Sequence, residues 1–260
     1  IWIWKRFMEK NLNIMTSKDL AIFNISEKHK SFTITPQSTG SRTFCHILDN
    51  FDFHTYELCN NTLQHKSNKV THNHTFRLFP NHEDYKLIMT GRNPYNRVVS
   101  NFRRSLQSKK HINKNFNFKI DFLEFVYDQF YSYTLNSLIK PNKDINSYSF
   151  KRFFIGFYDT SVTPDGFFER KIDHKIRIDS MEDDYKSIDF IKNSDYNKNG
   201  LLDLALSKKI GLIKKEVLDA YNIPLNWQDY YTQETADIVY KFCSEYFNTF
   251  EFEKDSWKKI

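Results

Sequence analysis

The stretch Lys86-Leu-Ile-Met-Thr-Gly-Arg-Asn-Pro-Tyr-Asn-Arg-Val-Val-Ser100 carries the clearest fold signal in the chain. The stretch from Lys86 to Thr90, with its apolar run from Leu87 to Met89, predicts a short buried strand that is broken by Gly91. Asn93 can cap a following helix, and Pro94 suits the first helical position. Apolar residues then recur at helical spacing and predict one buried face: Tyr95, Val98, Val99, Phe102 and Leu106. The stretch therefore predicts a strand, a loop and a helix.

A unit of the same kind lies nearer the N-terminus. Ser31-Phe-Thr-Ile-Thr35 alternates polar and apolar residues as a strand does, and Pro36 to Arg42 predicts a loop of small and polar residues. A helix follows, because apolar side chains recur at helical spacing at Phe44, Ile47, Leu48 and Phe51.

The pattern continues toward the C-terminus. Asp121-Phe-Leu-Glu124 has the spacing of a capping box and predicts a helix start, with Phe122, Phe125, Val126 and Tyr133 inward. Lys175 to Ile178 predicts another strand, and Ser180-Met-Glu-Asp183 a helix after it. Thr232 can cap a last helix with an apolar face of Val239, Phe242, Cys243, Tyr246, Phe247 and Phe250. Loops are expected at 136–146, 159–166 and 193–200.

Strands that alternate with helices predict an α/β fold. We expect a single domain with a central, mostly parallel sheet flanked by helices, over residues 31–260, preceded by an N-terminal extension at 1–30. In such sheets ligands bind beyond the carboxyl ends of the strands. Both loops described above are expected at that edge.

Composition narrows the class of partner. The 260 residues carry a formal net charge of +6 and a pI near 9.0, which favours an anionic partner. Three cysteines, Cys45, Cys59 and Cys243, have no metal-ligand spacing and predict free thiols, and no metal site is expected. No apolar run approaches the length of a membrane span. The first residues do not resemble a signal peptide, and the chain lacks an initiator Met.

The loop after the Lys86 strand has the chemistry of a phosphate site. Arg92 offers a planar fork of donors and Ser100 adds a hydroxyl, which suits a phosphate monoester. Arg97, Ser100 and Arg104 are expected on the helix face opposite the apolar one. By itself, such a pattern also fits an ordinary amphipathic helix with a solvated basic face.

The loop after the Ser31 strand could bind a second anionic group. Backbone N–H groups at the helix start, Gly40 and the hydroxyls of the loop favour an anion there. The sequence lacks the lysine of the nucleoside triphosphatase phosphate loop, and a turn without a ligand fits it as well. The candidate binding residues in this loop are Gln37, Ser38, Thr39, Gly40, Ser41, Arg42 and Thr43.

Taken together, the two loops resemble those of the sulfotransferase superfamily. Arg92 to Ser100 matches that family's Arg-(Asp/Asn)-Pro-(Tyr/Phe)-x-Arg-(Leu/Val)-(Leu/Val)-Ser segment, which binds the 3′-phosphate of the sulfate donor PAPS (3′-phosphoadenosine 5′-phosphosulfate). Gly40-Ser-Arg-Thr43 is similar to the 5′-phosphosulfate loop of the heparan sulfate and uronyl 2-O-sulfotransferases. Residues 176–185 and 230–257 resemble later segments of Golgi-type carbohydrate sulfotransferases. The resemblance implies a P-loop-like sulfotransferase fold, PAPS as donor and PAP as product.

The resemblance also implies a catalytic base. Thr71-His-Asn-His-Thr-Phe76 stands where the 2-O-sulfotransferase branch carries a His-x-His whose second His is the base, which points to His74, with His72 as its neighbour or substitute. Many family members have a Lys after the loop proline, where this chain has Gln37, so that Arg42 becomes the candidate to stabilise the leaving 5′-phosphate.

The expected reaction is in-line transfer of a sulfuryl group to a hydroxyl of a carbohydrate, and the surplus of Lys and Arg favours an anionic glycan. A catalytically impaired protein that binds PAP or PAPS is the alternative, since Gln37 brings no charge. A nucleotide kinase lacks support without the loop lysine, and a nucleic-acid-binding module rests on net charge alone. The chain would be cytoplasmic if complete, and Golgi-luminal if an upstream membrane anchor is missing.

Overall fold

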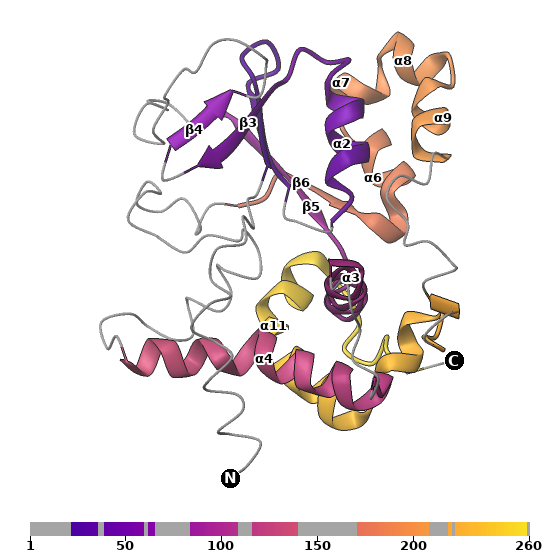
Figure 1. Cartoon of the computed structure of the whole chain (residues 1–260). Helices are drawn as coiled ribbons and strands as arrows, with labels where there is room; N and C mark the ends of the chain where they lie inside the picture. Colours follow the sequence, from indigo (N-terminus) through magenta and orange to yellow (C-terminus); the bar gives the residue numbers. More distant parts are fainter. Residues whose placement is uncertain are drawn as a thin grey trace.

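The computed structural model describes residues 22–35, 39–59, 62–65, 84–108, 116–139, 171–207, 218–219 and 222–258. In these residues the chain forms a six-stranded sheet with helices packed against it (Figure 1). In their order across the sheet, the strands are β4 (Thr62–His65), β3 (His54–Cys59), β1 (Ile22–Ser26), β2 (Ser31–Thr35), β5 (Lys86–Gly91) and β6 (His174–Arg177).

The sheet is mixed, and this corrects the expectation of a mostly parallel one. β2, β5 and β6 run parallel to one another, whereas β1 pairs antiparallel with both β2 and β3, and β3 with β4. Only four residues separate β1 from β2, and so short a turn joins antiparallel neighbours. The α/β class is thus confirmed. The sheet also extends past the boundary expected at residue 31, because β1 lies between β3 and β2.

The predicted strand and helix units recur in the structure with small shifts. β2 has the predicted bounds, β5 is one residue longer, and β6 begins and ends one residue early. The helices and 3-10 turns are α2 (Ser41–Leu48), α3 (Pro94–Ser108), α4 (Phe118–Ile139), η5 (Ile178–Ser180), α6 (Met181–Lys186), α7 (Asp189–Lys192), α8 (Asp195–Lys198), α9 (Leu201–Ser207), η6 (Trp227–Tyr230) and α11 (Gln233–Phe250).

Helix starts follow their capping chemistry, with one correction. Asn93 caps α3, since its Oδ1 accepts a hydrogen bond from the N–H of Tyr95, and Thr232 forms a capping box with Thr235 at the start of α11. The predicted start of α4 at Asp121 is wrong. Asn117 caps this helix instead, and the Asp121 carboxylate accepts the Asn117 N–H from inside the first turn.

Two predicted loops are partly helical. α4 runs to Ile139, three residues past the predicted loop start, and the rest of 136–146 lies outside the described residues, as does all of 159–166. Within 193–200 the chain forms the short helix α8, capped by the Ser194 side chain.

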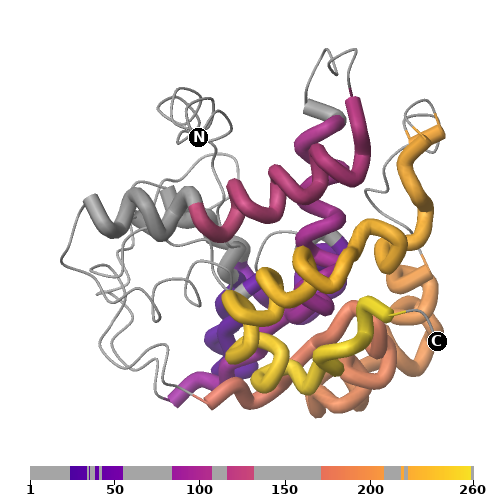
Figure 2. The backbone as a smooth tube through the Cα atoms, turned by 90° about the horizontal axis from the view of Figure 1, so that it is seen from below, coloured from indigo at the N-terminus to yellow at the C-terminus, as the bar shows by residue number. Residues whose placement is uncertain are grey.

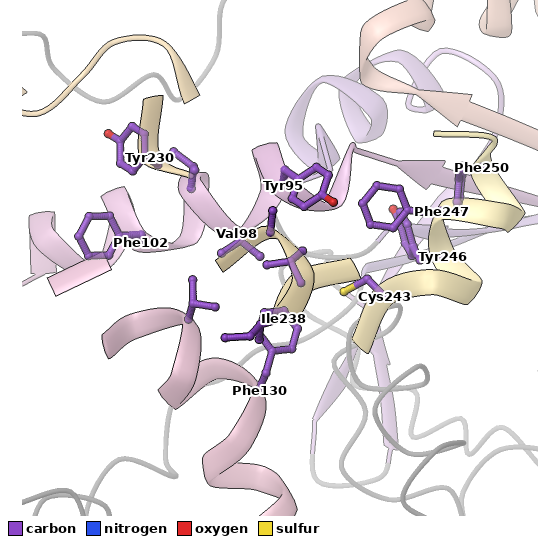
Figure 3. Packing of buried hydrophobic residues seen from close by; sticks show 14 of the residues in the cluster. Tyr95, Val98, Phe102, Phe130, Tyr230, Ile238, Cys243, Tyr246, Phe247 and Phe250 are labelled. Atoms are coloured by element: carbon purple, nitrogen blue, oxygen red, sulfur yellow. The ribbon is translucent and has the colours of Figure 1, made fainter. Parts of the chain in front are cut away.

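The two faces of the sheet carry separate cores. On one face Ile88 and Ile176 pack with α2, α6, α7 and α9. On the other, Leu87 and Met89 pack with α3, α4 and α11, in agreement with the alternation of side chains along a strand. Figure 1 shows α4 and α11 below the sheet, Figure 2 shows them side by side in front of it in the view from below, and Figure 3 shows several aromatic residues of this second core. All five predicted apolar positions of α3 are buried there.

We predict that Gly91→Ala destabilises the fold, because the added methyl group overlaps with the ring of Phe250. A Cβ at Gly91 would lie 2.3 Å from Cδ1 of Phe250, which is fully buried at the end of α11. We expect the free energy of unfolding, measured in urea, to fall by about 2 to 3 kcal/mol, as for other over-packed cores. Gly200→Ala is the control, because a Cβ there meets nothing within 4 Å and only the positive φ costs about 1 kcal/mol. Equal losses in the two variants would contradict the prediction.

Candidate functional site

The carboxyl ends of the three parallel strands lie side by side at one edge of the sheet. β2 leads toward α2, β5 leads into α3, and β6 leads through η5 into α6. The strand register brings Ile34 opposite Met89 and Gly91 opposite Arg177, so that the three connections begin at the same level. This is the edge at which open α/β sheets bind their ligands.

Two threonines connect the first two loops. The hydroxyls of Thr39 and Thr90 are 2.7 Å apart and both side chains are buried. The buried Thr35 Oγ1 has no hydrogen-bond partner among the described residues, although it ends β2 beside them. The two predicted loops are therefore adjacent at this edge of the sheet.

Gly40 starts α2 in a conformation that favours glycine. Its φ is +79°, and as the N-cap residue it has no side chain that could accept a hydrogen bond from the first N–H groups of α2. A Cβ at Gly40 would lie 3.0 Å from Cε of Met181 and 3.6 Å from Ile178, which shows that the segment after β6 packs onto this turn. The N-terminus of α2 is consequently suited to an anion.

Arg92 is held at the end of β5 by contacts on both sides. Its backbone N–H donates to the hydroxyl of Tyr246 in α11 (3.1 Å), and its guanidinium donates to Oδ1 of Asn96 in the first turn of α3 (2.8 Å). Burial raises the pKa of the Tyr246 hydroxyl to about 12. Ser100 follows Asn96 by one helical turn on the same face and is half-buried. The guanidinium, the amide and the hydroxyl thus line one strip of α3.

The electrostatic environment of Arg92 is unfavourable for a cation. Burial lowers the pKa of Arg92 to about 10; Asp179 opposes this shift, while Arg103, Arg97 and Arg104 add to it. A desolvated guanidinium among further arginines is a place where an anion relieves charge repulsion.

The other arginines of α3 differ in their exposure, and one of them, Arg97, is not on a solvated face as the sequence pattern predicts. Arg97 is buried rather than solvated, although it lies on the face of α3 opposite the apolar residues. Its charge acts there on Cys243 and Tyr246. Arg103 binds the carbonyl oxygens of Pro224 and Leu225 and the hydroxyl of Tyr230, so it anchors the chain before α11. The exposed side chain among them is that of Arg104, as predicted.

The turn after β6 contributes residues that the sequence analysis did not select. Asp179 lies two residues beyond the Gly91 and Arg177 pair and acts electrostatically on Arg92. Asp184 holds this turn, since its carboxylate accepts from the N–H and guanidinium of Arg177 and from the hydroxyl of Ser180. The pattern Ser180-Met-Glu-Asp183 correctly predicts a helix at this point. The Ser180 side chain, however, donates to Asp184 and does not cap the backbone of α6.

Several predicted site residues cannot be placed. Gln37, Ser38, His72 and His74 lie outside the described residues, and Ser41 and Arg42 are described only as the first turn of α2. Thr43 is half-buried in that turn. The structure thus brings Thr39, which precedes Gly40 and α2, into contact with Thr90, two residues before Arg92, and Ser100 lies along α3 from Arg92. Cys59 lies in β3, and of the other two thiols Cys243 is buried and Cys45 partly so.

The described residues contain neither a candidate metal site nor a candidate membrane span. Among these residues no group of His, Cys, Asp and Glu could hold a metal ion. No described helix is long and apolar enough to cross a membrane. Comparison of the chain with protein-family models, with curated proteins and with solved structures found no significant match.

Proposed function

We propose that this protein binds a 3′-phosphorylated nucleotide and is a PAPS-dependent sulfotransferase. The observation that carries the proposal is Arg92, a desolvated guanidinium at the carboxyl end of β5, next to the Gly40 turn through the contact between Thr39 and Thr90. The segment from Arg92 to Ser100 also resembles the 3′-phosphate segment of sulfotransferases. A nucleotide with phosphate only at its 5′ position would not need such a segment.

Each loop suits one end of the donor. Arg92, with Ser100 on the same strip of α3, offers charged and neutral donors to the 3′-phosphate. The start of α2, with Thr39 to Thr43, offers backbone N–H groups and hydroxyls to the 5′-phosphosulfate. The arginines whose charge lowers the pKa of Arg92 favour a ligand with several negative charges.

The proposed sulfuryl transfer also uses residues that lie outside the described part of the chain, His74 and His72. The acceptor hydroxyl attacks sulfur while the bond from sulfur to the 5′-phosphate oxygen breaks, and PAP leaves. In this proposal His74 takes the hydroxyl proton, with His72 as neighbour, and Arg42 stabilises the leaving phosphate in place of the lysine that Gln37 replaces. Positioning and charge stabilisation carry such a step, so it needs no metal in principle. A hydroxyl of an anionic carbohydrate is the proposed acceptor.

A second candidate function is binding of PAP or PAPS without turnover. The uncharged Gln37 favours it, because stabilisation of the leaving group is usually a large part of catalysis. The two candidates share the nucleotide site and differ in whether PAPS is consumed.

One binding assay tests what the two candidates share. In isothermal titration calorimetry we expect PAP to bind at least about tenfold more tightly than ATP, AMP or single-stranded DNA, because a charged hydrogen-bonded group contributes more than 1 kcal/mol. Equal affinity for ATP and PAP would support a general nucleotide site and contradict the proposal. Preference for the DNA would support a nucleic-acid-binding module instead.

A further inference from the structure

The turn between β6 and α6 is held rigidly against the proposed anion site. Asp184 accepts three hydrogen bonds from Arg177 and one from Ser180, at 2.7 to 3.2 Å, and fixes the residues on either side of the turn. Ile178 and Met181 pack against Gly40 at the start of α2. The side chain of Asp179 therefore projects from a turn that is anchored on both sides.

Asp179 lies within electrostatic range of the guanidinium that would bind phosphate. Gly91 is the register partner of Arg177. Arg92 and the turn that contains Asp179 therefore follow their strands at the same level of the sheet edge. Among charged groups, Asp179 acts most strongly on Arg92. Arg177 already has a carboxylate partner in Asp184, whereas Asp179 is exposed on one side and available to a ligand that approaches Arg92.

We propose that Asp179 is a built-in competitor, a fixed carboxylate that partly neutralises Arg92 and so weakens the binding of a phosphate to this guanidinium. This inference rests on the proposed anion site at Arg92 but not on the identity of the nucleotide. The Asp179 carboxylate already neutralises part of the charge of Arg92, so a phosphate gains less from this guanidinium and leaves faster than it would beside a neutral residue. Asp179 thereby favours product release over tight binding.

The test compares two isosteric substitutions that each remove one negative charge. Asp179→Asn removes the carboxylate beside Arg92, and Asp183→Asn removes an exposed carboxylate four residues away, in the first turn of α6. Each variant and the wild type are titrated calorimetrically with PAP and, separately, with inorganic pyrophosphate. We expect Asp179→Asn to bind both about fivefold more tightly, the size of a partly exposed charge pair, and Asp183→Asn to match the wild type.

A double substitution assigns the effect to Arg92. In an Arg92→Ala background, Asp179→Asn should no longer tighten PAP binding, because the charge it competes for is gone. Equal affinities of Asp179→Asn and Asp183→Asn for both ligands would overturn the inference, as would the same gain with and without Arg92. If PAP bound no better than AMP, the proposed nucleotide specificity would fail, while the pyrophosphate titrations would still decide the role of Asp179.

Discussion

Replacement of Arg92 by alanine should weaken PAP binding about 100-fold and AMP binding less than about threefold, since a charged bidentate contact to phosphate is worth some 2 to 3 kcal/mol. The difference arises because only PAP has a 3′-phosphate. Arg92 is desolvated, so its hydrogen bonds to an anion are stronger than those of an exposed arginine. The measurement is a calorimetric titration of both nucleotides into the folded variant.

Arg104→Ala is the matched control for Arg92→Ala. It removes the same charge from an exposed position of α3 and should cost little, because exposed charges are screened. Arg103 is unsuitable as a control, since its loss would free the carbonyl oxygens of Pro224 and Leu225. Equal losses of PAP and AMP affinity in Arg92→Ala would defeat the assignment of the 3′-phosphate to this residue.

Replacement of His74 by alanine should leave PAP binding intact and lower sulfuryl transfer by at least about 100-fold, the usual contribution of a general base. The base acts on the acceptor hydroxyl and does not contact the nucleotide, so binding and turnover should separate. Turnover is followed as transfer of radiolabelled sulfate from PAPS to a panel of glycans with free hydroxyls.

His72→Ala and His29→Ala are the controls for His74→Ala. His72 belongs to the same His-x-His stretch, and a loss at His72 but not at His74 would exchange their roles. His29 lies in the turn between β1 and β2, where its ring stacks on Phe190 with 4.3 Å between ring centroids, so its loss should not alter transfer. Normal turnover of His74→Ala would exclude it as the base. No transfer in the wild type, with PAP bound, would favour the binding protein without turnover.

Local sequence patterns predicted the units that form the site. The bounds of β2, the start of α3 at Pro94 and the buried face of α11 follow from residue spacing and capping, which depend on neighbours in the chain. The antiparallel strands β1, β3 and β4 were not predicted. Their pairing joins segments whose own patterns are weak, and strand stability depends on which partner lies alongside.

The sequence alone determined that Arg92 follows a buried strand and precedes a capped helix, because both depend on adjacent residues. Only the tertiary structure decided what surrounds that guanidinium. Arg97 is buried on a helix face that the sequence pattern predicts to be solvated, and Asp179 acts on Arg92 because β6 pairs with β5, which brings Arg177 opposite Gly91. Burial and charge proximity between distant segments are properties of packing, and they set the electrostatics of the proposed site.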